Sequence, residues 1–304
     1  ILEQIQTTPT PNISKITWHL REFIKLVLDN KTQKHTLLII GRQGCGKTST
    51  IKSVLKEFFT AEQLTKIIKN GYTTPLAYYN LLYDNENGIF FFDDLEGIYH
   101  NKIGISLLKQ TTDTEKSRFV CYSSTTGKLE HRTTSFFFKG NQILCMNTYP
   151  KSKDFLPILS RIRPVVFNPT YKEILVMCYE IIKERYEDIP LKEKVSIIEF
   201  LERNTSEATE NFDLRLLGDF VDLYRYCGGI NEKFKEMSKS IIETNIVKEK
   251  VLELSKMAMP IKEQEKDFIK STQMSRATFY NIRNELGLVR NYKNYVEDVM
   301  QTIS

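Results

Sequence analysis

The feature that most constrains the fold is a glycine-rich run that follows a short apolar segment. The run Gly41-Arg42-Gln43-Gly44-Cys45-Gly46-Lys47-Thr48 matches the pattern GxxxxGK[ST]. It lies between an expected buried strand at 36–40 and an expected helix at 47–59. Glycines let successive backbone N–H groups curl around phosphate oxygens, and the start of the helix adds partial positive charge. The sequence therefore predicts a phosphate-binding loop in an α/β fold.

This loop has the residues needed to bind ATP and Mg²⁺. We expect Lys47 to reach the β- and γ-phosphates and the Thr48 hydroxyl to ligate Mg²⁺. Nucleotide contacts are expected along the whole loop, which comprises Gly41, Arg42, Gln43, Gly44, Cys45, Gly46, Lys47, Thr48 and Ser49. The alternative is a glycine-rich turn that binds nothing.

Two adjacent carboxylates end the next apolar run. Ile89–Phe92 reads as a buried strand, and Asp93 and Asp94 follow it. We expect Asp93 to hold the Mg²⁺ shell and Asp94 to polarise the attacking water, with Glu96 as a second candidate base. The pattern is that of a Walker B strand, although strand ends also meet charged turns that have no catalytic role.

A neutral amide follows a third strand candidate. Asn147 comes directly after the apolar run at 142–146, and an amide there can hold the attacking water near the γ-phosphate. The alternative is an Asn that caps a strand-to-loop turn.

The order of apolar segments predicts how the chain is organised. Its 304 residues, 41% of them hydrophobic, suffice for two ordinary domains. A leading helix at 16–30 is followed by strands alternating with helices, which predicts a doubly wound α/β domain. Three amphipathic segments at 171–185, 191–203 and 213–226 then predict a helical subdomain that ends at Gly228-Gly229. We therefore divide the chain into 1–34, 35–168, 169–229 and 230–304.

The composition bears on the expected location and partners of the protein. No run of about 18 apolar residues occurs and the start is not a secretory signal, so neither a membrane span nor export is expected. The five cysteines are scattered, odd in number and never in CxxC, which favours a reducing cytoplasm over disulfides or a zinc site. The formal net charge of +5 permits nucleic-acid binding without demanding it.

Taken in order, these motifs resemble the AAA+ ATPase family. Walker A, Walker B and a sensor-1 Asn147 are followed by Leu159-Ser160-Arg161, which matches the family's arginine finger. The run Asp213-Leu214-Arg215-Leu216-Leu217 is similar to its sensor 2, so 169–229 would be the helical lid. The resemblance implies ATP hydrolysis with Arg161 acting in trans and Arg215 on the nucleotide, in a homo-oligomer that is commonly a hexameric ring. The family usually has Glu where this chain has Asp94.

An insertion between Walker B and Asn147 predicts a hairpin. Two β-rich segments, at 118–124 and 129–139, flank a turn with Gly127. The insertion resembles the pre-sensor-1 hairpin of replicative helicases such as the minichromosome-maintenance and superfamily III helicases. We expect Lys128 at its tip and Arg132 to contact DNA, with further charge from Arg118, His131 and Lys139. The alternative is an ordinary surface hairpin.

The C-terminal segment predicts a second DNA contact. Helices at 263–270 and 275–286 flank a turn and resemble a helix-turn-helix, with 292–299 as a wing or a last helix. Ile282 and Leu286 are expected in its core. Side chains expected to be free for DNA are Arg276, Thr278, Asn281 and Arg283. The alternative is a plain helical hairpin.

These features together favour an ATP-driven DNA translocase or helicase in replication, a ring whose pore hairpins act on single-stranded or forked DNA. One alternative is an ATP-dependent initiator, loader or transposition regulator that binds DNA without unwinding it. A further alternative is an AAA+ remodeller whose target is protein.

Overall fold

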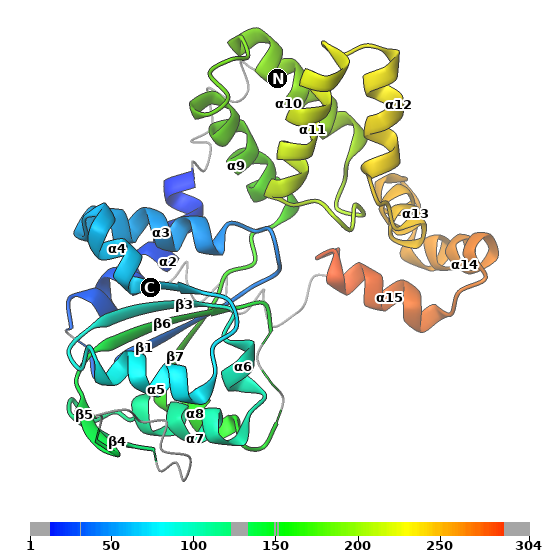
Figure 1. The fold of residues 1–304 in the computed structure, drawn as a ribbon. Helices are drawn as coiled ribbons and strands as arrows, with labels where there is room; N and C mark the ends of the chain where they lie inside the picture. Colours follow the sequence, from blue (N-terminus) through cyan, green and yellow to red (C-terminus); the bar gives the residue numbers. More distant parts are fainter. Residues whose placement is uncertain (1–12, 31, 123–132, 149, 151, 289–304) are drawn as a thin grey trace, which may run out of the picture. The chain divides into compact units, whose positions relative to one another are not determined.

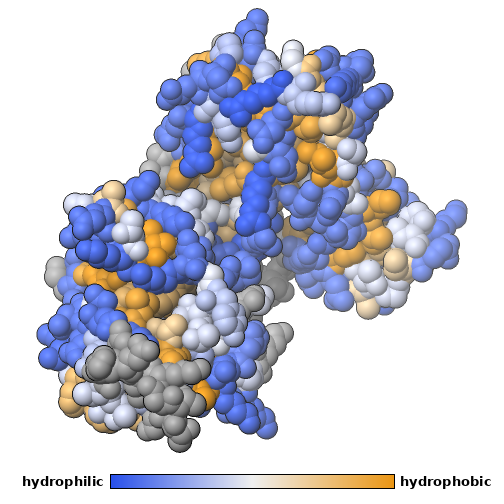
Figure 2. Space-filling model, viewed as in Figure 1, coloured by the Kyte–Doolittle hydropathy of each residue, from blue (hydrophilic) through white to orange (hydrophobic). Residues whose placement is uncertain are grey.

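The computed structural model describes residues 13–30, 32–122, 133–148, 150 and 152–288 (Figure 1). Contacts divide the chain into two compact units, Ile1–Glu180 and Ile181–Ser304. Charged and polar residues cover most of the face drawn in Figure 2, where apolar residues form interrupted patches. Among the described residues, no helix combines the length and apolar character that crossing a bilayer requires.

A five-stranded parallel sheet organises the first unit. Its strands are β1 (Thr36–Ile40), β2 (Ile68–Asn70), β3 (Ile89–Asp93), β6 (Asn141–Met146) and β7 (Arg163–Val166). They lie in the order β2-β3-β6-β1-β7, and every pairing is parallel. The strands expected at 36–40, 89–92 and 142–146 are confirmed as β1, β3 and β6. The edge strand β2 was not expected, because three partly exposed residues are too few to show a period.

Helices cover both faces of this sheet, which confirms the doubly wound arrangement (Figure 1). One face packs on α2 (Ile13–Leu28), α3 (Lys47–Phe58) and α4 (Ala61–Ile67). The other packs on α5 (Pro75–Tyr83), α6 (Glu96–Tyr99), α7 (Lys102–Thr111) and α8 (Leu156–Arg161). Because strands buried on two faces need apolar side chains at every position, β3 reads as a continuous apolar run.

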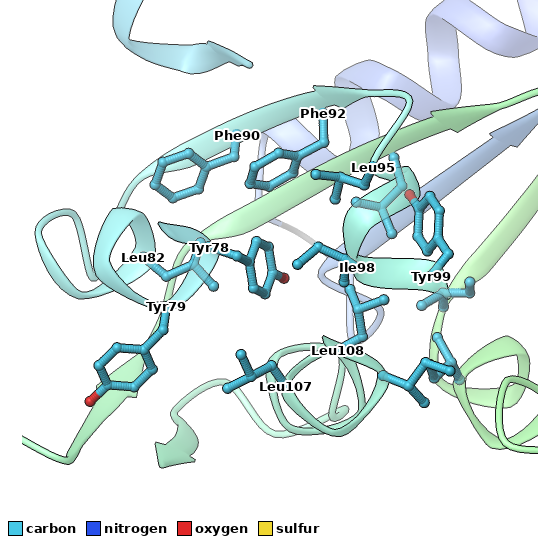
Figure 3. Packing of buried hydrophobic residues seen from close by; sticks show 14 of the residues in the cluster. Tyr78, Tyr79, Leu82, Phe90, Phe92, Leu95, Ile98, Tyr99, Leu107 and Leu108 are labelled. Carbon is cyan, nitrogen blue, oxygen red and sulfur yellow. The ribbon is translucent and has the colours of Figure 1, made fainter. Parts of the chain in front are cut away.

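Strand β3 illustrates this two-sided packing. Phe90 and Phe92 belong to the cluster on the α5–α8 side, and the intervening Phe91 belongs to the opposite cluster. Figure 3 shows Phe90 and Phe92 pointing toward Tyr78 and Ile98, which come from α5 and α6. The short helix that follows β3 is thereby fixed beneath the end of the strand.

The predicted hairpin is present as an antiparallel pair. Strand β4 (Arg118–Cys121) pairs with β5 (Ser135–Phe138), and Phe119 lies opposite Phe137. The residues expected at its tip, including Lys128 and Arg132, lie outside the described residues.

The second unit is helical in its described residues. Helix α9 (Tyr171–Glu184) spans the division between the units, and α10 (Leu191–Asn204), α11 (Leu214–Cys227) and α12 (Glu232–Ile241) follow. The rings of Phe200, Phe220 and Phe234 pack between the last three helices in tilted and edge-to-face arrangements. The expected end of α11 is confirmed, because Gly228 caps it in the left-handed region at φ 67°.

A second small core lies near the C-terminus. Helices α13 (Ile246–Lys256), α14 (Ile261–Thr272) and α15 (Arg276–Glu285) pack around Val251, Leu254, Phe268, Phe279 and Ile282. The expected helix pair is therefore confirmed, with an added third helix. Residues 292–299, where a wing was expected, lie outside the described residues.

Candidate nucleotide-binding site

The loop between β1 and α3 has a backbone that only glycine adopts without strain. Gly44 and Gly46 have φ values of 69° and 95°. A Cβ on Gly41 would lie 2.0 Å from the carbonyl oxygen of Phe167, so a side chain is excluded there. The loop's own geometry therefore requires glycine at these positions of the motif.

Lys47 ties the loop to the end of β6. Its side chain is buried, and Nζ donates hydrogen bonds to the carbonyl oxygens of Gly41 (2.6 Å) and Arg42 (2.8 Å) and to Oδ1 of Asn147 (3.0 Å). The parallel register explains the meeting, since Ile40 lies opposite Met146 and each strand then ends at the same edge. The structure thus brings together Lys47 and Asn147, which lie 100 positions apart in the sequence.

Thr48 and Asp93 form the second link across this edge. The Thr48 hydroxyl donates to Oδ2 of Asp93 at 3.0 Å. The Thr48 hydroxyl lies in the first turn of α3 and the Asp93 carboxylate ends β3. Hydroxyl and carboxylate oxygens are the hard donors that Mg²⁺ prefers, so the pair fits the expected ion. The neighbouring Cys145 is buried, and burial followed by the charge of Asp93 raises the pKa of its thiol to about 12. It is therefore a neutral neighbour of the carboxylate.

Asp94 directly follows β3 and lines a pocket. Its backbone is left-handed, with φ 58°, and its N–H donates to the carbonyl of Cys145 at 3.2 Å. Asp94 and Asn147 line one pocket of about 210 Å³. The other residues that line it are Tyr99, His100, Met146, Thr148 and Pro150. Glu96 begins α6, but its side chain lies outside the described part of the structure.

A second pocket adjoins the phosphate loop and was missed by sequence reasoning. It measures about 170 Å³ and is lined by residues of α2, β7, α9 and the segment between β7 and α9, namely Ile16, His19, Leu20, Val165, Val166, Phe167, Asn168, Pro169 and Glu173. The backbone N–H of Arg42 donates to Oδ1 of Asn168 at 2.7 Å, which joins this pocket to the loop. Only the pairing of β7 with β1 brings these segments together, and no local pattern reveals it.

Arg161, the expected arginine finger, makes contacts within its own chain. Its Nη1 donates to the carbonyl of Lys109 at 2.7 Å and lies 3.4 Å from Oδ2 of Asp113, and its side chain is 38% exposed. The reason is that α8 packs on α7, whose C-terminal carbonyls attract a cation. Arg161 also lines a surface pocket of about 340 Å³. Arg163, two residues further along, donates from Nη2 to Thr32 Oγ1 at 3.3 Å.

Arg118 was expected to add positive charge for DNA binding, and the structure shows instead that it does not face solvent. The side chain is buried, donates to the carbonyls of Gly140 and Glu115 and lies over the Phe138 ring at 4.8 Å. Burial lowers its pKa to about 10. Strand alternation explains the result, because Arg118 and Val120 face inward while Phe119 faces outward.

Arg283 was expected to be free for DNA, and this expectation is contradicted because the side chain is buried. It is 6% exposed, and its guanidinium donates to Gln264 Oε1 (2.8 Å) and to the Leu288 carbonyl (3.1 Å). Phe279 lies one helical turn before Arg283, so the two share the face of α15 that packs on the core. The expected core positions Ile282 and Leu286 are confirmed.

Two other predicted arginines are exposed. The Arg276 side chain is 72% exposed, with Nε 3.3 Å from Oε1 of Glu265. Arg215 lies exposed in the first turn of α11, which Asp213 caps. Their expected roles in DNA and nucleotide binding stay predictions.

No family model matches the chain. A curated protein of Enterobacteria phage T4, an uncharacterized 36.7 kDa protein in the nrdC-mobD intergenic region, is 26% identical over 162 residues, 51% of this chain and 50% of that protein. The chain thus spans about half the length of this relative.

Solved structures resemble the chain at low identity. A DNA replication initiation factor is 14% identical with a TM-score of 0.48, covering 82% of this chain and 72% of that one. Aeropyrum pernix Orc1 in complex with DNA is 14% identical with a TM-score of 0.46, covering 92% and 86%. The Thermotoga maritima RuvB Holliday junction branch migration motor is 13% identical with a TM-score of 0.42, covering 92% of each chain. At these scores the similarities establish neither family nor function.

Proposed function

We propose that the chain is an AAA+ ATPase that hydrolyses ATP with Mg²⁺. The observation that carries the proposal is the pair of hydrogen bonds that join Lys47 to Asn147 and Thr48 to Asp93. Strand β6 lies between β1 and β3, so its terminal amide is placed between the phosphate loop and the acidic strand end. Three motifs separated in the sequence thus meet at one edge of the sheet.

Each group at this edge has a role in phosphoryl transfer. The loop N–H groups and Lys47 bind the phosphates, while Thr48 and Asp93 hold Mg²⁺, which supplies charge neutralisation. Asp94 polarises the attacking water and Asn147 orients it. Sensor 2 is assigned to Arg215. The pocket beside Asn168 offers a site for the base of the nucleotide.

We further propose DNA as the target, with the protein acting as a translocase or helicase in replication. The hairpin supports this, because Phe119 and Phe137 are both about half exposed and their rings lie 5.4 Å apart. Exposed aromatic rings are suited to stacking on unpaired bases. The exposed Arg276 suits a phosphate contact, and Lys128 and Arg132 are assigned to the same task.

A ring of identical subunits, six in number, completes the proposal. Arg161 lies on the surface with its guanidinium oriented by Lys109 and Asp113, which suits donation to a neighbour's γ-phosphate. A cytoplasmic location fits the five scattered cysteines of the sequence, whose number and spacing favour a reducing compartment.

One experiment tests the central proposal. ATP hydrolysis is measured with and without single-stranded DNA for the wild type and for Lys47→Ala. We expect hydrolysis that DNA stimulates, and a loss on the order of 10²-fold or more in the variant, because the charge on the β- and γ-phosphates is removed. Equal turnover in both proteins would refute the ATPase assignment.

The same assay separates the rival functions. Hydrolysis that does not respond to DNA favours a protein remodeller. Hydrolysis that DNA stimulates, without unwinding of a forked duplex, favours an initiator, loader or transposition regulator.

A further inference from the structure

One buried hydroxyl beside the proposed site has no hydrogen-bond partner among the described residues. It is that of Tyr99, the last residue of α6, which is 5% exposed. Its ring packs edge-on against Phe155, with centroids 5.9 Å apart, so the ring is held in place. The equally buried hydroxyl of Tyr78 differs, because it contacts Thr111 at 3.0 Å and Gln142 at 2.5 Å.

The Tyr99 hydroxyl is placed at the acidic end of β3. Figure 3 shows it pointing toward Leu95, in the segment that leaves the strand. Tyr99 lines the same 210 Å³ pocket as Asp94 and Asn147. Burial, followed by the neighbouring Tyr78 and Cys145 and by the charges of Asp94 and Asp93, holds its pKa well above the ordinary value. The hydroxyl therefore stays protonated and acts as a hydrogen-bond donor.

The acceptor that best matches this donor is the carboxylate of Asp94. Asp is one methylene shorter than Glu, and Asp94 is held on a left-handed backbone at the pocket rim. A catalytic carboxylate must be fixed within a fraction of an ångström to polarise water productively. Buried polar groups in native proteins are almost always paired, so the lone donor of a residue that lines this pocket calls for a partner near it.

We propose that Tyr99 is a positioning residue for ATP hydrolysis, whose hydroxyl donates a hydrogen bond to Asp94, directly or through one water, and holds that carboxylate against the attacking water. The inference rests on the proposed ATPase function. In the step, the water oxygen bonds to the γ-phosphorus, the bond from that phosphorus to the β–γ bridging oxygen breaks, and Asp94 accepts the water's proton. Tyr99 keeps its own proton throughout.

The test compares two variants that each remove one buried hydroxyl. Tyr99→Phe keeps the ring and should lower kcat about 10-fold, with KM, Mg²⁺-nucleotide binding and Tm unchanged, because only the orientation of Asp94 is lost. The matched control Tyr78→Phe should lower Tm with kcat unchanged, since its two hydrogen bonds lie outside the site.

A double-mutant cycle then ties the effect to Asp94. In the Asp94→Asn background, Tyr99→Phe should leave the residual single-turnover rate unchanged, because the carboxylate it orients is gone. Three results would each overturn the inference: wild-type kcat in Tyr99→Phe, a fall in kcat together with a fall in Tm as large as that of Tyr78→Phe, or additive losses in the cycle.

Failure of the inference is distinguishable from failure of the proposed function. If the wild type hydrolyses ATP in a Lys47-dependent manner and Tyr99→Phe equals it, only the role of Tyr99 is refuted. If the wild type shows no Lys47-dependent hydrolysis, the ATPase proposal and this inference are both refuted.

Discussion

At the scale of single residues, the site depends on which carboxylate activates water. Asp94 and Asn147 line the same pocket, and the side-chain amide of Asn147 accepts a hydrogen bond from Lys47. We predict that Asp94→Asn lowers ATP hydrolysis by about 10²-fold or more while nucleotide binding is retained, because a neutral amide does not accept the proton.

Glu96→Gln is the matched control for this prediction, since it makes the same chemical change two residues further along. It should lower hydrolysis less than Asp94→Asn. Steady-state hydrolysis and fluorescent-nucleotide binding measure both effects, and the reverse ordering would assign the base to Glu96.

At the scale of elements, the strands and helices that depend on local sequence patterns could be predicted. The strands at 36–40 and 89–93 and the helix from Lys47 were predictable, because apolar runs and the glycine motif mark them directly. The pocket at Asn168 was not, because it depends on β7 pairing with β1. The unpaired hydroxyl of Tyr99 was likewise invisible, since hydrogen bonding is decided by tertiary packing.

Charge on an amphipathic element was the least predictable property. Arg118 and Arg283 were expected to meet DNA, yet both are buried and donate to carbonyl oxygens. Their guanidinium groups lie over the rings of Phe138 and Phe279, so each occupies a position that a hydrophobic residue would otherwise fill. A sequence pattern shows that an arginine is present, but it does not show whether its guanidinium binds DNA phosphates or backbone carbonyl oxygens.

Helix α15 provides a direct test of this distinction. We predict that Arg276→Ala weakens DNA binding and its salt dependence while Tm is unchanged. The Arg276 side chain is 72% exposed, and an ion pair such as the one it makes with Glu265 at the surface adds little stability. Arg283→Ala should instead destabilise the protein by about 1–3 kcal/mol, because buried acceptors lose their donor.

Fluorescence anisotropy across a salt series and thermal unfolding measure the two properties separately. If Arg283→Ala keeps the wild-type Tm and loses DNA binding, the assignment of α15 is reversed. If Arg276→Ala binds DNA with wild-type affinity and salt slope, the helix-turn-helix role of this segment is wrong.

At the scale of the whole molecule, the proposed reaction requires more than one copy of the chain. Arg161 is oriented by Lys109 and Asp113 at the surface. In a ring with a head-to-tail interface, each site combines the loop of one subunit with the arginine of the next. Subunits with Arg161→Ala and subunits with Lys47→Ala should each be inactive alone, because every interface then lacks one of the two groups.

Mixing the two variants should restore activity. At equal amounts, random assembly pairs an intact loop with an intact arginine at about a quarter of the interfaces, so hydrolysis should recover to roughly that share of the wild-type rate. Subunit exchange is verified by labelling each variant with a different fluorophore. Full exchange without recovery would show that Arg161 acts within its own subunit or stabilises α7 alone, and the requirement for a ring would then lose its chemical basis.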